Sequence, residues 1–238
     1  MIAGTAPADR TVDVAFIGRA NIDLTVHVPQ RPGPGQTAFG SELLTAPGGK
    51  SLNQAIAVAH LGGRACLVAN AGDDQWGRHL ITALIEAGVN AAHFRLLSGA
   101  RTGAAIIEIT PDGENFLVLA LSPATELTAE QVNHALTRID APVVTVQLDM
   151  PPEPLTTVLT RRRSPVLIGN LVPHPGFDRR LMNRLDVFVA NQSEAAMILG
   201  LADVDPLAAA EQLRQLGPSA VVVTAGQSGA AYSHCLMQ

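Results

Sequence analysis

This chain of 238 residues is poor in cysteine, aromatic residues and charge. Its two cysteines, Cys66 and Cys235, lie far apart, which argues against a disulfide framework and against a zinc knuckle. The seven histidines do not occur at metal-ligand spacing. Charged residues make up 16% of the chain and the formal net charge is −5, so a nucleic-acid backbone is disfavoured as the main partner.

Long apolar runs are also missing from the sequence. No stretch is long enough to span a bilayer, and the amino terminus has neither the basic region nor the apolar core of a signal peptide. The sequence therefore predicts a cytoplasmic protein without a membrane partner. Aromatic residues make up only 3% of the chain, so few rings are present to stack against a nucleobase.

Apolar residues are abundant, at 47%, and the length allows one large α/β domain or one domain with a small lobe. Apolar strands alternate with helices in the pattern of a doubly wound, mainly parallel sheet, which binds ligands at the carboxyl ends of its strands. Strands are expected at residues 12–17, 65–69, 143–148, 166–168, 187–190 and 220–224, and helices at 51–61, 76–87, 128–139, 153–160, 194–199 and 206–216.

Three segments do not fit a buried sheet. Residues 22–27, 37–46 and 104–120 have the character of half-exposed strands, and the last segment contains a hairpin turn, Pro-Asp-Gly, at 111–113. We interpret these segments as a small β-sheet lid over the cleft, within a single α/β domain that spans residues 1–238.

The rest of the chain is arranged around one glycine-rich stretch. Residues 46–55 have the sequence Ala-Pro-Gly-Gly-Lys-Ser-Leu-Asn-Gln-Ala, with a helix expected directly behind the glycines. Glycine lets a ligand approach the main chain, and a helix amino terminus presents unpaired N–H groups. Lys50 adds a positive charge, and Asn53 adds both a donor and an acceptor. These features predict a cradle for a small polar ligand.

Taken one at a time, the local signals have simpler interpretations. A P-loop would need a glycine where Leu44 stands, and the dinucleotide-binding fingerprint lacks its Gly-x-Gly spacing after the first strand. Gly48 and Gly49 could form only a tight turn. For the other polar residues, a turn, solvated-loop or helix-cap role competes with a ligand role; these are Asn21, Asp23, Asp149, Asn191 and Glu194.

Together the motifs resemble those of the ribokinase-like (pfkB-type) carbohydrate kinases, from residue 12 to about residue 231. The first family signature is carried by Gly-Gly-Lys-Ser-Leu-Asn-Gln-Ala at 48–55, followed by Gly62 and Gly72. Supporting matches are Gly-Arg-Ala-Asn-Ile-Asp at 18–23, Gly-Asp-Asp-x-x-Gly at 72–77, Thr-Gly at 102–103, Asn-Gln-Ser-Glu at 191–194 and Thr-Ala-Gly-Gln-Ser-Gly at 224–229. Within the family, the first signature is similar to that of the ribokinase branch.

The resemblance implies ATP-dependent phosphorylation of a sugar hydroxyl, with ribose or a related pentose as the substrate. Magnesium is the implied cofactor, with potassium as a further cation to consider, and a homodimer joined through the lid is the implied assembly. Sugar contacts are implied for Asn21, Asp23, Gly48, Gly49, Lys50, Asn53 and Asp149, the last standing where ribokinases usually carry glutamate. Contacts with the nucleotide are implied for Asn191, Thr224, Gly226, Gln227, Ser228 and Gly229, and a magnesium contact through water for Glu194.

The second signature of the family, Gly-Ala-Gly-Asp, does not occur in these 238 residues. In the family its glycines form an anion hole and its aspartate is the general base, so the sequence offers no catalytic residue to name. Because both contributions to rate are large, we expect sugar binding with severely reduced or absent turnover, and interpret the chain as a C-terminally truncated kinase. A nucleoside kinase of the same family and a non-catalytic sugar-binding pseudokinase are the alternatives.

Overall fold

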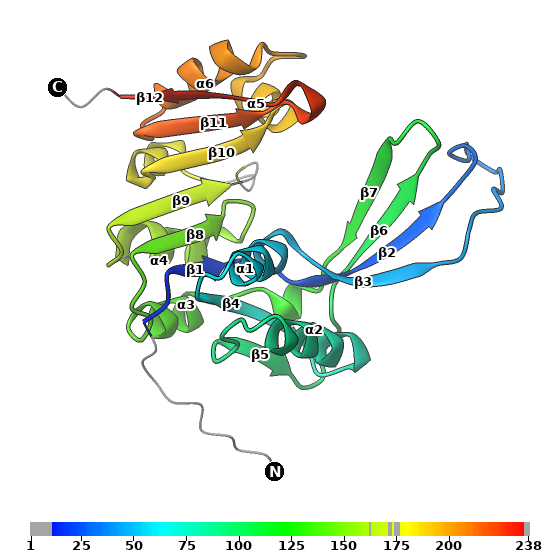
Figure 1. Ribbon diagram of the computed structural model, residues 1–238, viewed down its shortest axis with the longest axis horizontal. Helices are drawn as coiled ribbons and strands as arrows, with labels where there is room; N and C mark the ends of the chain where they lie inside the picture. Colours follow the sequence, from blue (N-terminus) through cyan, green and yellow to red (C-terminus); the bar gives the residue numbers. More distant parts are fainter. Residues whose placement is uncertain (1–10, 162, 171–172, 174–176, 236–238) are drawn as a thin grey trace.

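The computed structural model describes residues 11–161, 163–170, 173 and 177–235. A main sheet of eight strands has the order β12-β11-β10-β9-β8-β1-β4-β5, and a second sheet of four strands, β3-β2-β6-β7, projects from its side (Figure 1). The main-sheet strands are β1 (Val14–Ile17), β4 (Ala65–Gly72), β5 (Phe94–Leu97), β8 (Val143–Gln147), β9 (Val166–Asn170), β10 (Val187–Asn191), β11 (Ala220–Thr224) and β12 (Ala230–His234).

The doubly wound, mainly parallel sheet predicted from the sequence is confirmed. Neighbouring strands run parallel from β5 to β11, and only β12 at one edge is antiparallel. Two strands were missing from the prediction, β5 and β12, and both lie at sheet edges. An edge strand needs less apolar sequence than a central one, so β12, which alternates between exposed and half-buried residues, gives a weak signal.

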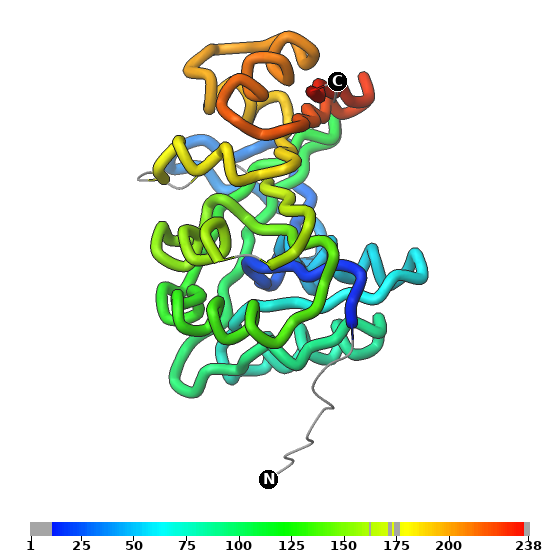
Figure 2. The backbone as a smooth tube through the Cα atoms, turned by 90° about the vertical axis from the view of Figure 1, so that its left-hand side faces the viewer, coloured from blue at the N-terminus to red at the C-terminus, as the bar shows by residue number. Residues whose placement is uncertain are grey.

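Among the described residues, six α-helices pack on the two faces of the main sheet. Helices α3 (Ala129–Leu136), α4 (Pro152–Arg161), α5 (Gln192–Leu199) and α6 (Pro206–Arg214) share one apolar core with β8 to β11, and α1 (Lys50–His60) and α2 (Gln75–Glu86) share a second core with β1 and β4. The segments after residue 180 lie at one end of the molecule, and α2 and β5 lie at the other (Figure 2). None of the described helices is long and apolar enough to cross a membrane.

The face of the sheet that carries α1 and α2 is covered unevenly. Along β9, β10 and β11 every second side chain is buried against α4 to α6, while Ile168, Val189 and Val222 on the opposite face are only half buried. A hollow of about 360 Å³ opens there beside α1, and its lining includes Ile168, Val189 and Asn170. Within the described residues, this part of the sheet therefore presents an apolar face without a helix on it.

The second sheet consists of the segments that the sequence analysis interprets as a lid, and we keep that name for it. Its strands are β2 (Asn21–His27), β3 (Leu44–Gly48), β6 (Ala104–Ile109) and β7 (Asn115–Ala120), with β2 and β6 parallel and the outer pairs antiparallel. The strand predicted over residues 37–46 is observed only from Leu44 onward. Residues 37–43 contribute a single backbone bond to β2, from Ser41 N to His27 O, because their side chains are exposed and have no sheet to pack against.

Candidate functional site

The lid joins the main sheet at the carboxyl end of β1. Only three residues separate β1 from β2, and α1 begins beside this junction with Gly49 as its N-cap residue. Gly49 has φ 97° and ψ 130°, and a β-carbon there would lie 2.8 Å from the Ala20 Cα and the Arg19 carbonyl oxygen. Glycine alone tolerates both the dihedral angles and the contact, so it allows the helix amino terminus to approach the junction closely.

Asn21 and Asp23 lie against the glycine pair. The Asn21 side-chain amide donates a hydrogen bond to Asp23 Oδ1 over 2.8 Å, and Gly48 is the register partner of Asn21. A β-carbon on Gly48 would fall 2.2 Å from the Asp23 carboxylate, so the missing side chain makes room for that carboxylate. Burial raises the pKa of Asp23, and the hydrogen bond from Asn21 works in the opposite direction.

Lys50 connects this corner to the far part of the sheet. Its Nζ lies 2.9 Å from Glu194 Oε1, although the two residues are 144 positions apart in the sequence. The Lys50 side chain is 51% exposed and the Glu194 side chain 15% exposed. Asn53, exposed and three residues further along α1, lies on the same side of the helix as Lys50.

Asn191 and Glu194 form the amino-terminal cap of α5. The Glu194 N–H donates to Asn191 Oδ1 over 2.8 Å, and the Asn191 N–H donates to Glu194 Oε2 over 2.9 Å. The helix-cap alternative raised by the sequence is therefore present in the structure. Glu194 Oε2 accepts from the cap residue Asn191, and Glu194 Oε1 accepts from Lys50. Glu194 can therefore cap α5 and contact Lys50 at the same time.

The remaining residues with an implied nucleotide role form an exposed turn. Thr224 is the register partner of Asn191 at the ends of β11 and β10. Gly226, Gln227 and Ser228 form the short 3-10 helix η3 (Gly226–Ser228), which the Ala225 N–H closes by donating to the Gly229 carbonyl over 2.8 Å. No hydrogen bond or ion pair found among the described residues joins this turn to the Gly48–Gly49 corner; the Lys50–Glu194 pair joins the start of α1 to α5, beside the end of β10.

A magnesium ion fits this site only in a limited way. Mg²⁺ typically takes one or two protein carboxylates, with phosphate oxygens and waters completing its octahedron. Both carboxylate oxygens of Glu194 already accept hydrogen bonds, one from Lys50 and one from the Asn191 N–H. Nowhere in the described part of the chain do three His, Cys, Asp or Glu residues group as a metal site. Glu194 therefore fits a metal contact through water, whereas direct ligation would displace Lys50.

Asp149 occupies a charged cluster after β8. Arg19 Nη1 donates to Asp149 Oδ2 over 2.6 Å, Arg19 Nη2 donates to the Asp149 carbonyl over 2.9 Å, and Arg19 Nε donates to Glu126 Oε1 over 2.7 Å. The second carboxylate oxygen, Asp149 Oδ1, is buried and has no hydrogen-bond partner among the described atoms. Burial raises the pKa of Asp149; the charges of Arg19 and Lys50 oppose this rise, and Glu126 adds to it.

The sequence analysis missed the residues that support this cluster. The buried Gln147 accepts hydrogen bonds at Oε1 from the Arg19 N–H (2.6 Å) and from Ser51 Oγ (2.7 Å), and a β-carbon on Gly18 would overlap both groups. Arg19 had a usable signal, because it is a charged residue inside the motif at 18–23, directly after a buried strand. Glu126 and Gln147 belong to no motif, so only the folded chain brings them to the site.

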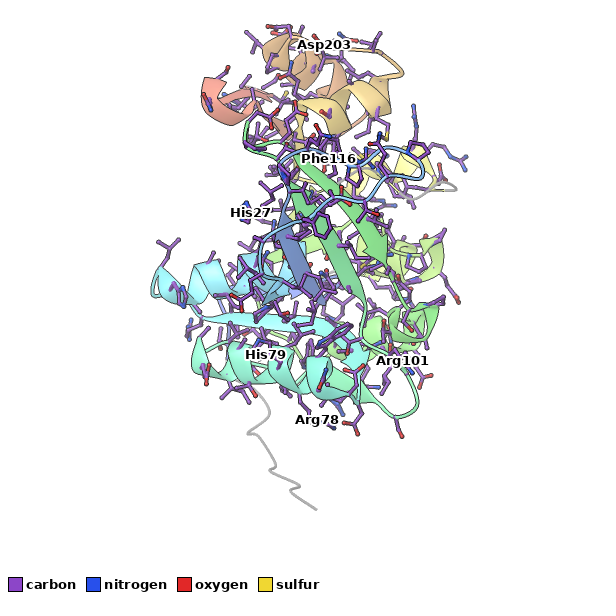
Figure 3. All side chains as sticks on the ribbon, turned by 90° about the vertical axis from the view of Figure 1, so that its right-hand side faces the viewer. His27, Arg78, His79, Arg101, Phe116 and Asp203 are labelled. Atoms are coloured by element: carbon purple, nitrogen blue, oxygen red, sulfur yellow. The ribbon has the colours of Figure 1, made fainter. Side chains whose placement is uncertain are left out.

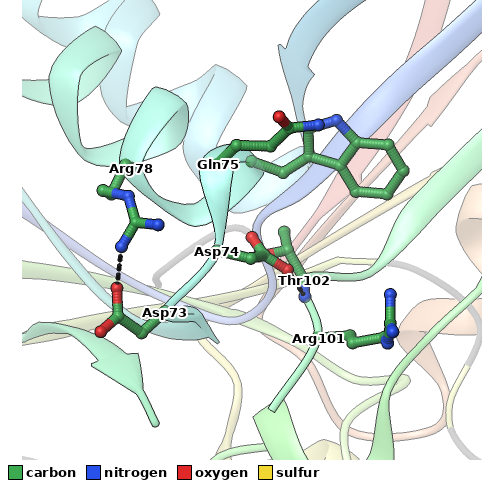
Figure 4. A pocket seen from close by; sticks show the side chains of 7 residues that line it. Asp73, Asp74, Gln75, Arg78, Arg101 and Thr102 are labelled. Atoms are coloured by element: carbon green, nitrogen blue, oxygen red, sulfur yellow. Dashed lines mark hydrogen bonds and ion pairs between the residues drawn. The ribbon is translucent and has the colours of Figure 1, made fainter. Parts of the chain in front are cut away.

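The motif at residues 72–77 has a structural explanation. Asp74 is the N-cap of α2; its carboxylate accepts from the Gly77 N–H over 2.8 Å and from Thr102 Oγ1 over 2.7 Å. An open hollow of about 560 Å³ lies beside this cap, where Arg78 pairs with Asp73 and Arg101 stands opposite (Figure 4). The carboxylates of this hollow already have partners, and none of its lining residues belongs to the Asn21–Lys50 corner.

A doubly wound α/β sheet with a β-lid, and a glycine-lysine corner where the two meet, is the architecture found in sugar kinases of the ribokinase-like fold. Residues 12–236 match the model of the pfkB family carbohydrate kinases, and the chain belongs to this family. By family it is a sugar kinase.

Three relatives show the extent of the similarity. The chain is 26% identical over 222 residues to the ribokinase of Haemophilus influenzae, covering 91% of this chain and 72% of that protein. It is 29% identical over 223 residues to the ribokinase of Mus musculus, covering 91% and 69%. The solved structure of the ribokinase from Giardia lamblia matches with a TM-score of 0.82 at 27% identity, covering 95% of this chain and 74% of that one.

Proposed function

We propose that the corner between lid and sheet binds ribose or a related pentose through its hydroxyl groups. The observation that supports this best is the Asn21–Asp23 pair held against Gly48 and Gly49, with the charge of Lys50 beside it. A carboxylate accepts hydrogen bonds from hydroxyls, while amide and ammonium groups donate to them. We add Asn53 to this cradle because it lies on the exposed side of α1. We add Asp149 because its buried Oδ1 has no hydrogen-bond partner among the described atoms.

The reaction that we propose for this family site is phosphoryl transfer from ATP to one sugar hydroxyl; for residues 1–238 by themselves we expect it to be severely slowed or absent, because they lack the second signature. The nucleotide would lie at the ends of β10 and β11, near Asn191, Thr224 and the exposed turn of Gly226, Gln227, Ser228 and Gly229. Bound magnesium supplies neutralisation of phosphate charge in such transfers. Glu194 would orient it through water, and Lys50 stands between this region and the sugar cradle.

A sugar is favoured over a nucleoside by the side chains that the lid directs toward the cradle. Phe116, labelled in Figure 3, is the only Phe, Tyr or Trp residue in the four lid strands. The strand register places it on the face opposite Asp23. The Arg31 guanidinium carbon, Cζ, lies over the Phe116 ring, 4.4 Å from its centroid. The cradle side of the lid therefore offers aliphatic contacts from Ile107 and Leu117 in place of a stacking ring.

Calorimetry with a panel of ribose, 2-deoxyribose, fructose and adenosine tests the proposed ligand. A pentose is expected to bind, and Asp23→Ala is expected to remove the binding. Arg64→Gln serves as a matched control, because its exposed partner is Asp13 at the opposite end of β1. Tighter binding of adenosine than of any pentose would contradict the proposal in favour of a nucleoside kinase.

A coupled ADP-release assay tests the catalytic part of the proposal. Residues 1–238 lack the second signature, so we expect sugar-dependent thermal stabilisation with little or no ADP production. Rapid ADP release by these residues alone would show that the missing motif is not needed.

We further propose that two copies of the chain pair through the lid. Both lid faces expose large apolar side chains, at 43–58% of their surface, which a second lid would cover; these are Leu44, Ile106, Leu117, Val118 and Leu119. Sedimentation analysis should show a dimer that Leu117→Glu dissociates. Leu61→Glu, at an 87% exposed position after α1, should leave it intact. The cytoplasmic location predicted from the sequence also remains a prediction.

A further inference from the structure

Arg19 stands at the centre of the charged cluster around Asp149 and has no role of its own in the proposed function. Its side chain is only 15% exposed and is bound to two carboxylates that come from different parts of the chain, Glu126 and Asp149. Its own backbone N–H is fixed by the buried Gln147. A guanidinium held by three hydrogen bonds, on a residue whose backbone is fixed as well, has little freedom to move.

We propose that Arg19 is a positioning residue for substrate binding: it fixes Asp149 so that one carboxylate oxygen, Oδ1, is left to accept a single sugar hydroxyl. This inference rests on the proposed sugar-binding function and deepens it. Arg19 touches Asp149 and Glu126 and does not itself need to touch the sugar.

The geometry distinguishes the two oxygens of Asp149. Arg19 Nη1 donates a hydrogen bond to Oδ2, and Arg19 Nη2 donates to the carbonyl oxygen of the same residue. The side chain and the main chain of Asp149 are therefore both held by one planar guanidinium. Oδ1 is left buried without a partner among the described atoms. A buried acceptor without a partner is costly, and a ligand hydroxyl that donates to it would relieve that cost on binding.

Glu126 completes the arrangement by engaging the third nitrogen of the same guanidinium. Arg19 Nε donates to Glu126, while Nη1 and Nη2 donate to Asp149. Rotation of the guanidinium away from Asp149 would therefore break the Glu126 contact too. Two carboxylates around one arginine leave the cluster with a net negative charge, which suits a neutral polyol and disfavours an anionic sugar.

A double-mutant cycle in ribose binding tests the inference. Asp149→Asn is expected to weaken ribose binding about 10- to 100-fold, and Arg19→Gln about 10-fold, as for loss of a hydrogen bond to a charged group. The double variant should bind about as weakly as Asp149→Asn alone, because Arg19 acts through Asp149. Arg19→Lys keeps the charge, guards against a folding failure of the glutamine variant, and should lose less affinity than Arg19→Gln.

The pH dependence of binding separates positioning from a merely structural role. The charged groups that face Asp149 are Arg19, Glu126 and Lys50. Removing the positive charge of Arg19 raises the pKa of Asp149, so ribose binding by Arg19→Gln should be lost at a higher pH on acidification than binding by the unmodified protein. Arg64→Gln, which removes an arginine from an exposed ion pair elsewhere, should leave the profile unchanged.

A carbon-13 NMR titration of the Asp149 carboxyl in the sugar-free protein keeps the inference testable whatever the substrate is. An Asp149 pKa that is the same with and without Arg19 would overturn it. Equal and additive losses of ribose affinity in the double-mutant cycle would also overturn it. If the unmodified protein bound none of the sugars while Arg19→Gln still raised the pKa, the proposed sugar function would fail and the positioning of Asp149 would stand.

Discussion

Gly49→Ala probes the contact on which the candidate site depends. Residues with dihedral angles near φ 97° and ψ 130° are almost always glycine, and forcing alanine into such a conformation costs about 1–3 kcal/mol. The new β-carbon would also lie 2.8 Å from the Ala20 Cα and the Arg19 carbonyl oxygen, which are main-chain atoms and cannot rotate away. Overpacking of this kind costs about 1–3 kcal/mol more.

The variant should therefore be less stable by about 4 kcal/mol, which corresponds to a fall in melting temperature of about 8–16 °C for a chain of this size. Gly62→Ala is the matched control, because Gly62 also has a positive φ, of 86°, but a β-carbon there meets nothing within 4 Å. It should cost only about 1–2 kcal/mol for the left-handed backbone. Melting temperatures of the two variants within about 1 °C of each other would refute the argument from the main-chain contact.

Three further predictions follow. Gly48→Ala should abolish sugar binding with a small change in stability, since its β-carbon meets the movable Asp23 carboxylate at 2.2 Å; calorimetry and thermal melting on the same sample check this. Burial raises the pKa of Asp23 above its usual 3.8, so the folded state loses stability as the pH rises through that folded pKa. Asp23→Asn should accordingly be more stable than the unmodified protein in urea unfolding at about pH 7, with the gain gone at about pH 3. Cys66 is buried, which raises its pKa to about 12, whereas Cys235 is exposed; a thiol reagent should therefore modify only Cys235 until the protein is unfolded.

The sequence predicted the main sheet well because its central strands are continuous apolar runs. Strands such as β4 and β8 are buried on both faces, so their composition alone distinguishes them from loops. The errors fall where tertiary context decides the outcome. Residues 37–43 were predicted as a strand but form only one backbone hydrogen bond to β2. β5 has only four residues and pairs with β4 at one edge of the main sheet.

The candidate site was predictable only where its residues are close in the sequence. Gly48, Gly49 and Lys50 form one motif, and Asn21 and Asp23 form another, so their types and spacing carry information before folding. The pairing of Arg19 with Asp149 spans 130 residues and that of Arg19 with Glu126 spans 107. Such contacts depend on strand order, which composition and periodicity do not encode, and this is why the charged cluster behind Asp149 was missed.

Strand order also explains why all of these residues meet. β1 lies between β4 and β8, so the chain proceeds toward one edge of the sheet through β4 and β5 and toward the other edge from β8 to β11. Open α/β sheets bind ligands at such a reversal point, at the carboxyl ends of the strands. There the chain leaves β1 directly for the lid, which forces Arg19 to lie beside the end of β8 and brings the start of α1 against the same junction. A substitution that weakens the Arg19–Gln147 contact should therefore disturb both Asp149 and the Gly49 corner, whereas Glu194→Gln, which removes the charge partner of Lys50 without changing the cradle residues, should affect mainly the connection to the β10–β11 end.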